Sequence, residues 1–246
     1  MSDQIMALIS KWLMTDTHDR MTGRQVPNTS ANSVCLSVLP VADTYCRAIM
    51  ELVDQNYKLP AMALLRVLIE LMLKVCWCLD RTSEEDTESK IQSWYKNSLK
   101  QRRNWLKGMA EGELAAEEWR DAYEKEIEAM DEVIEEIHQK PIPPFGALVK
   151  DLPGRCRDIY RVVYKQALQG IHPDLLVLMD TVKQDGDELV SIGDIHSVAE
   201  KDLQGHCLYM ALRLACWVRT YQGWECREME DEAEVVLRRL GERKVE

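Results

Sequence analysis

The chain has 246 residues, which is enough to bury a sizeable core in one large domain or two small ones. Gly (11) and Pro (8) are few, a composition that favours helices over strands. The net charge of −11 argues against a protein that coats nucleic acid with a uniformly basic surface. The eight cysteines have no disulfide-framework spacing and follow no signal peptide, so we expect reduced thiols in a cytoplasmic protein.

Hydrophobic periodicity predicts helices through the first third of the chain. Apolar residues share one face over 2–14, a polar and irregular loop is expected over 15–33, and a second helix over 33–56. Pro60 then suits the first turn of a third helix over 61–79, whose sequence is AMALLRVLIELMLKVCWCL.

A charge reversal marks the next two helices. Residues 89–110 hold six Lys or Arg and no acid, whereas 111–136 hold twelve acids. We expect an antiparallel helix pair over 84–138, inserted as a charged hairpin into a single helical domain that spans 1–246. Its thin apolar seam is predicted to consist of Trp94, Trp105, Trp119, Ile127 and Ile134.

The last third of the chain is also predicted to be helical. Helices are expected over 154–169 and 174–183, followed by a turn-rich loop over 183–194 for which a short β-ribbon is the alternative. One long helix is expected over 196–239. Every long periodic segment indicates a helix, so the predicted fold class is all-α.

Three charges interrupt the apolar helix over 61–79. Arg66, Glu70 and Lys74 are four residues apart, a spacing that places them in one narrow stripe on the helix. Each charge would cost about 2.5–3.5 kcal/mol at the centre of a membrane, so we expect a helix buried in protein and no membrane association. Buried charges need partners, which must come from elsewhere in the chain.

The expected partner is the segment RDIYRVVYKQALQGIHPD, residues 157–174. Its candidate residues are Tyr160, Arg161, Tyr164, Lys165 and His172. The tyrosine hydroxyls and the histidine would complete a polar network around Arg66 and Glu70. The alternative is that this network only fixes the register of the helices.

Metal and cofactor signatures are weak. The CWC sequence looks like a pair of metal ligands, but Cys76 and Cys78 lie about 200° apart on a helix and point to opposite sides. They are therefore interpreted as buried structural thiols. The histidine and carboxylate spacings supply no convincing third ligand, so neither a metal nor a cofactor is expected.

The pairing of LLRVLIE with the later IYRVVYKQALQGIHP resembles an uncharacterised bacterial and phage family of all-α proteins related to HEPN domains. Members share an Arg-x-x-x-Glu helix and a downstream tyrosine-bearing helix that leads to His-Pro. The resemblance covers residues 33–80 and 154–225. It implies a HEPN-like helical bundle, with the hairpin over 84–138 as an insertion.

Many HEPN domains are metal-independent ribonucleases of toxin–antitoxin and antiphage systems. They act as dimers, with an Arg-x(4–6)-His motif at the seam. No histidine of this chain follows an arginine at that spacing; Lys165 before His172 and Lys201 before His206 come nearest. Lysine neutralises a phosphate but lacks the bidentate fork of arginine.

Two functions therefore remain open. The first is a HEPN-like module of a bacterial or phage conflict system that acts on RNA or binds a nucleotide. Its catalytic residues would be His172, Arg66 and Glu70, with His172 as general acid or base. Its binding residues would be Tyr160, Arg161, Tyr164 and Lys165.

The second function is a non-catalytic scaffold. The Arg66–Glu70–His172 network would then be structural, and the hairpin over 84–138 would dock a partner protein. In either case we expect a homodimer, because the last helix carries an apolar face for a second copy. That face consists of Leu208, Leu212, Ala215 and Trp217.

Overall fold

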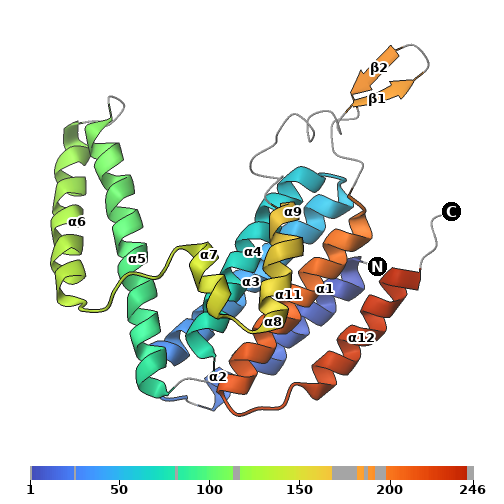
Figure 1. Cartoon of the computed structure of the whole chain (residues 1–246), viewed down its shortest axis with the longest axis horizontal. Helices are drawn as coiled ribbons and strands as arrows, with labels where there is room; N and C mark the ends of the chain where they lie inside the picture. The colour runs from blue at the N-terminus through green and yellow to red at the C-terminus, as the bar shows by residue number, and fades with distance from the viewer. Residues whose placement is uncertain are drawn as a thin grey trace. The chain divides into compact units, whose positions relative to one another are not determined.

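The structure is a computed structural model, and its described regular elements are helices apart from one β-hairpin (Figure 1). The predicted all-α class is confirmed. The chain divides into two compact units, one formed by Met1–Leu79 with Leu152–Glu246 and the other by Asp80–Asp151. The described residues are 2–24, 26–80, 83–112, 117–167, 182–185, 188–191 and 198–242.

The N-terminal helical segment is longer than predicted. It runs through α1 (Ser2–Ser10), the π-helical turns of η1 (Lys11–His18) and α2 (Asp19–Gly23). The loop predicted over 15–33 is therefore wrong up to Gly23. The buried face continues into Thr17 and Met21, so the helix stays attached to the core although most of its other residues here are polar.

Helix α3 (Ser30–Asp54) confirms the second predicted helix. It starts at an N-cap in which the Thr29 hydroxyl accepts a hydrogen bond from the backbone N–H of Asn32 (3.2 Å). By length and composition it is the one described helix that could cross a membrane. Asp43, on its buried side, accepts hydrogen bonds from Ser10 (2.7 Å) and Arg47 (2.8 Å). Core helices of folded proteins pass the same length test.

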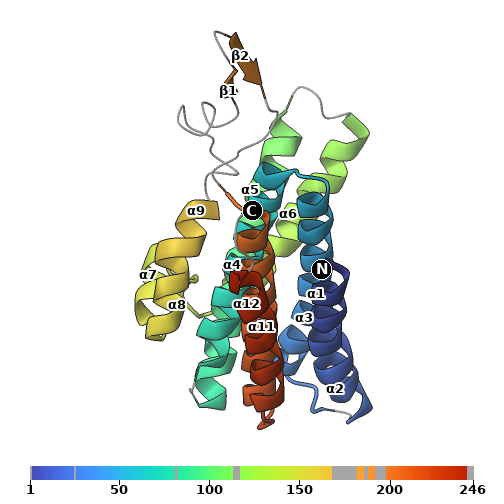
Figure 2. The ribbon, with the colours of Figure 1, turned by 90° about the vertical axis from the view of Figure 1, so that its right-hand side faces the viewer.

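Helix α4 (Lys58–Leu79) contains the apolar stretch with its three charges. Eleven of its residues are buried, which confirms the prediction of a helix enclosed by protein. It packs against α3 and against α11 (Glu200–Tyr221), and the three helices lie side by side in both views (Figure 1 and Figure 2). These three helices form the core of the first unit.

The last part of the chain is two helices, so the single helix predicted over 196–239 is wrong. Helix α11 ends at Tyr221 and α12 begins at Arg227 (Arg227–Glu242). Gly223 adopts φ +72°, which stops the helix because glycine enters the left-handed region without steric cost. The amphipathic α12 then packs back against α11.

The apolar face proposed for a second copy lies inside this bundle. Leu208, Leu212 and Ala215 are buried within one chain. The basis on which the sequence predicted a homodimer interface is therefore wrong, whereas homodimerisation itself stays a prediction.

The segment that starts at Gly154 packs on α4. It consists of α8 (Gly154–Ile159), the π-helical η3 (Tyr160–Tyr164) and α9 (Lys165–Ala167). Residues 174–181 of the helix predicted over 174–183 lie outside the described residues, and its last two residues begin a strand instead. Strands β1 (Val182–Asp185) and β2 (Glu188–Ser191) pair antiparallel, so the alternative of a short ribbon is confirmed.

The second unit is built on an antiparallel helix pair, α5 (Glu84–Glu111) and α6 (Glu117–Glu136), followed by α7 (Phe145–Leu148) and the 3-10 turn η2 (Val149–Asp151). The basic α5 and the acidic α6 are joined by ion pairs such as Arg103–Asp131 (2.6 Å). The interior holds Leu106, Met130 and Ile134, packed with Leu99, Tyr123 and Ile127.

Two tryptophans of the predicted seam are not in it. Ile127 and Ile134 lie in the interior as expected, but Trp105 and Trp119 are 60% and 57% exposed. Trp105 precedes the buried Leu106 by one residue, about 100° around the helix, and so lies off the face that Leu106 buries.

Candidate functional site

The charged stripe of α4 meets the tyrosine-bearing segment in a three-residue cluster, Arg66, Glu70 and Tyr164. Arg66 Nε donates to Glu70 Oε1 (3.0 Å) and to the Tyr164 hydroxyl (3.2 Å), and that hydroxyl donates to Glu70 Oε1 (2.8 Å). The sequence predicted this contact, because burying the stripe requires partners from another helix.

The hydrogen bonds assign a protonation state to each group. Burial raises the pKa of Tyr164, so its hydroxyl is a neutral donor at physiological pH. Burial acts to lower the pKa of Arg66, but the Tyr164 hydroxyl and the Glu70 carboxylate outweigh it and the pKa is raised. The cluster is thus a guanidinium and a carboxylate bridged by a neutral phenol.

Arg66 forms its hydrogen bonds through one edge, and its guanidinium carbon lies 5.5 Å from the centroid of the Tyr164 ring. Its Nε carries a single hydrogen, which Glu70 and Tyr164 share. Among the described residues, its terminal nitrogens form no hydrogen bond or ion pair, and 22% of the side chain is exposed. The outer edge of the guanidinium therefore keeps N–H donors that no described residue takes up.

The other candidate residues of this segment are distributed around the cluster. The ring of Tyr160 stacks on that of Tyr164, with centroids 5.0 Å apart and planes 23° apart. Arg161 and Lys165 are exposed on the adjoining face. His172, the expected acid or base, lies outside the described residues. Its contact with Arg66 and Glu70 therefore stays a prediction.

The cysteines are packed in neighbouring pairs. The sulfurs of Cys76 and Cys156 are 3.4 Å apart, while Cys78 interacts with Cys35 of α3. The two CWC cysteines thus point to different neighbours and both are buried, as predicted. Within the described ranges, no three His, Cys, Asp or Glu residues gather as a metal site would require.

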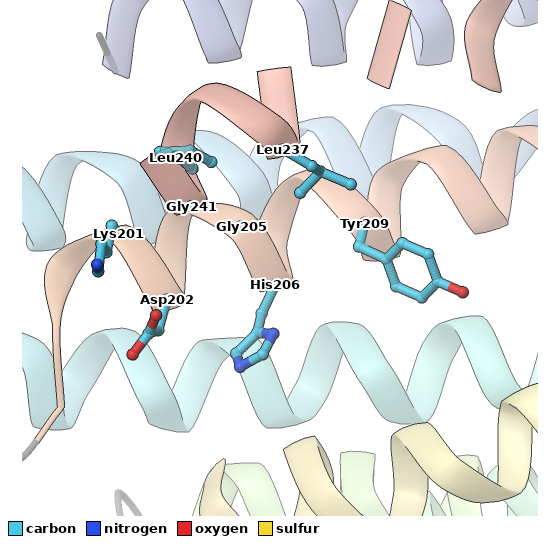
Figure 3. Close-up of a pocket in the computed structure, with 8 residues that line it drawn as sticks. All are labelled: Lys201, Asp202, Gly205, His206, Tyr209, Leu237, Leu240 and Gly241. Atoms are coloured by element: carbon cyan, nitrogen blue, oxygen red, sulfur yellow. The ribbon is translucent and has the colours of Figure 1, made fainter. Parts of the chain in front are cut away.

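A hollow of about 340 Å³ lies along α11 and α12. Asp202 and His206 project from one side of α11, and Leu237 and Leu240 of α12 line the hollow as well (Figure 3). Burial lowers the pKa of His206, although Asp202 opposes the shift. The i,i+4 spacing of this pair was visible in the sequence, but the return of α12 that forms the hollow was not.

Comparison with known proteins gives one result. A family model described as a family of unknown function (DUF5677) matches residues 32–189, more than half of the chain. The chain belongs to this family. The region that matches DUF5677 contains all three residues of the Arg66 cluster. No curated protein and no solved structure matches the chain.

Proposed function

We propose that this DUF5677 protein is a HEPN-like helical module of a bacterial or phage conflict system that binds a phosphate of RNA or of a nucleotide at Arg66. One observation supports the proposal above the others. Arg66 is fixed through Nε by Glu70 and Tyr164, while its terminal N–H groups have no partner in the described chain.

An arginine held in this way is suited to anion recognition. The outer edge of a guanidinium offers two parallel N–H donors that match two phosphate oxygens, and anchoring it in advance lowers the entropic cost of binding. Glu70 offsets the charge of Arg66, so further positive charge is needed for affinity. The exposed Arg161 and Lys165, on the same segment as Tyr164, would supply it.

The connectivity of the two units supports an inserted hairpin. The chain leaves its first unit after Leu79 and returns to it at Leu152, so the compact unit Asp80–Asp151 begins and ends at the first unit. An inserted domain has this connectivity. The bundle of α3, α4 and α11 with the tyrosine-bearing segment would then be the HEPN-like part.

RNA binding tests the proposal directly. We expect a fluorescein-labelled single-stranded RNA to bind the protein in a fluorescence anisotropy titration, and Arg66→Gln to weaken binding about tenfold. Lys74→Gln is the matched control, because Lys74 is the third charge of the same stripe and has no ion pair in the described chain. Equal affinities for the two variants would refute a role for Arg66.

Cleavage is tested separately from binding. If the module is a ribonuclease, its activity should persist in EDTA and His172→Ala should abolish it. Intact RNA after prolonged incubation with the wild-type protein in EDTA would remove the metal-independent ribonuclease and leave the binding module.

A non-catalytic scaffold is the second candidate, favoured by the aromatic surface of the helix pair. Trp105 and Trp119 expose 60% and 57% of their surface. Exposed tryptophans are typical of protein contacts. If the hairpin joins two copies, light scattering after size exclusion should give a dimer mass that Trp105→Ala with Trp119→Ala reduces to the monomer.

A further inference from the structure

Two arginines of the N-terminal segment lie over one tryptophan from the last part of the chain, and a third arginine acts on one of them electrostatically. Trp224 lies in the turn between α11 and α12, and the guanidinium carbons of Arg20 and Arg24 are 4.3 and 5.2 Å from the centroid of its ring. Arg219, five residues before Trp224, acts electrostatically on Arg20. These four residues are called the arginine cluster below.

The cluster holds more positive charge than the carboxylate that acts on it offsets. Arg219 uses its donors on backbone carbonyls, those of Glu225 (2.9 and 2.6 Å) and of Asp16 (3.0 Å). Of the charges that act on Arg20, those of Arg24 and Arg219 repel it and that of Asp16 attracts it. Burial, and then these two arginines, lower the pKa of Arg20.

Such a concentration of positive charge needs a physical reason in a chain with a net charge of −11. Like charges destabilise the folded state unless a counter-charge joins them, and the described chain places no carboxylate in ion-pair contact with Arg20 or Arg24. Stacking offsets part of the repulsion, because an arginine over an indole gains cation–π energy.

An arginine that stacks on a ring keeps its N–H donors for other groups. A guanidinium on an aromatic ring uses its face, while its N–H donors lie in its plane and point past the ring. Among the described residues, the side chains of Arg20 and Arg24 form no hydrogen bond or ion pair. Planar donors beside an aromatic ring are the combination that proteins use for a phosphate next to a nucleobase.

We propose that Arg20 and Arg24, stacked on Trp224, form together with the backbone-anchored Arg219 a binding site for the phosphate group of a nucleotide, either free or within single-stranded RNA. The site shares no residue with the Arg66 cluster and does not depend on the function proposed for it. Two of its arginines lie before the region that matches DUF5677, and the other two residues lie after it.

The first experiment measures the anisotropy of a fluorescein-labelled ten-nucleotide RNA. The double variant, Arg20→Gln with Arg24→Gln, should weaken binding at least about tenfold. It should also lower the slope of log K against log salt by about one for each phosphate contact that it loses. Arg239→Gln is the matched control, an exposed arginine of α12 with no ion pair in the described chain. It should change the affinity less than about twofold.

The second experiment uses the wild-type protein and so does not depend on the folding of a variant. Phenylglyoxal modifies accessible arginines, and mass spectrometry gives the modification rates of Arg20 and Arg24 with inorganic phosphate, AMP or the RNA present. Protection by AMP and RNA supports a nucleotide phosphate, protection by RNA alone supports RNA as the source, and equal protection by inorganic phosphate supports the phosphate group alone. No protection by any of the three, with unchanged affinity of the double variant, would overturn the inference.

The two sites fail independently. If Arg66→Gln abolishes RNA binding while the double arginine variant binds normally, the arginine cluster is not the site and the function proposed for Arg66 stands. The opposite result supports the arginine cluster and refutes Arg66.

Discussion

Replacing Tyr164 with phenylalanine removes one oxygen atom from the Arg66 cluster and leaves the buried ring in place. That oxygen donates to Glu70 (2.8 Å) and accepts from Arg66 (3.2 Å). Hydrogen bonds to charged groups contribute about 1.5–3 kcal/mol each when the partner is left unsatisfied. The two partners here remain 3.0 Å apart.

Solvent reduces the cost of this substitution. The side chains of Arg66 and Glu70 are 22% and 27% exposed, so water replaces part of the lost bonding. We therefore expect Tyr164→Phe to lower the free energy of unfolding by about 1–2 kcal/mol. For a chain of this length each kcal/mol corresponds to about 2–4 °C in melting temperature.

Thermal unfolding followed by circular dichroism measures the change. Tyr57→Phe is the control, because Tyr57 is 53% exposed and its hydroxyl has no hydrogen bond in the described chain. A double-mutant cycle with Glu70→Gln should give a coupling energy above about 0.5 kcal/mol. If Tyr164→Phe melts within about 0.3 kcal/mol of the control, the hydroxyl does not join the two helices and the network is misassigned.

Three further predictions concern other parts of the chain. A hydrogen bond from the Cys216 thiol outweighs burial and lowers the pKa of Cys226, so the midpoint of its alkylation rate against pH with iodoacetamide should lie below the value of about 8.5 for an unperturbed thiol; a midpoint at or above that value would contradict the assignment. Burial lowers the pKa of His206, so the unfolded state binds more protons and stability is lost as pH falls below about 6.5; His206→Gln should flatten that loss in urea titrations at pH 7 and pH 5. Replacing 84–138 with a short linker should leave a protein that is soluble and melts cooperatively. An insoluble or unfolded deletion variant would show that this unit is not an insertion.

The sequence predicted the elements whose residues are close in the chain. Arg66 and Glu70 are one helical turn apart, so their stripe followed from periodicity, and the cost of buried charge then pointed to Tyr164. The break at Gly223 was missed because a single glycine within a helical pattern is tolerated at a cost of only about 1 kcal/mol.

The arginine cluster had no signal in the sequence. Arg20 and Trp224 are 204 residues apart in the chain and meet only because the N-terminal helix continues past its predicted end and α11 stops at Gly223. Both deviations from the prediction were needed to form the site. Long-range packing therefore determined this contact, and local propensity did not.

The neighbouring cysteines show that closeness of two sulfurs and readiness to oxidise are separate properties. The sulfurs of Cys76 and Cys156 are 3.4 Å apart and belong to different helices. A disulfide forms through a thiolate, however, and burial in apolar surroundings disfavours that anion, as it does for Cys35, whose pKa it raises to about 12. The interior can thus bring thiols together as small apolar groups while keeping them slow to react, so the thiols add packing and no covalent link between their helices.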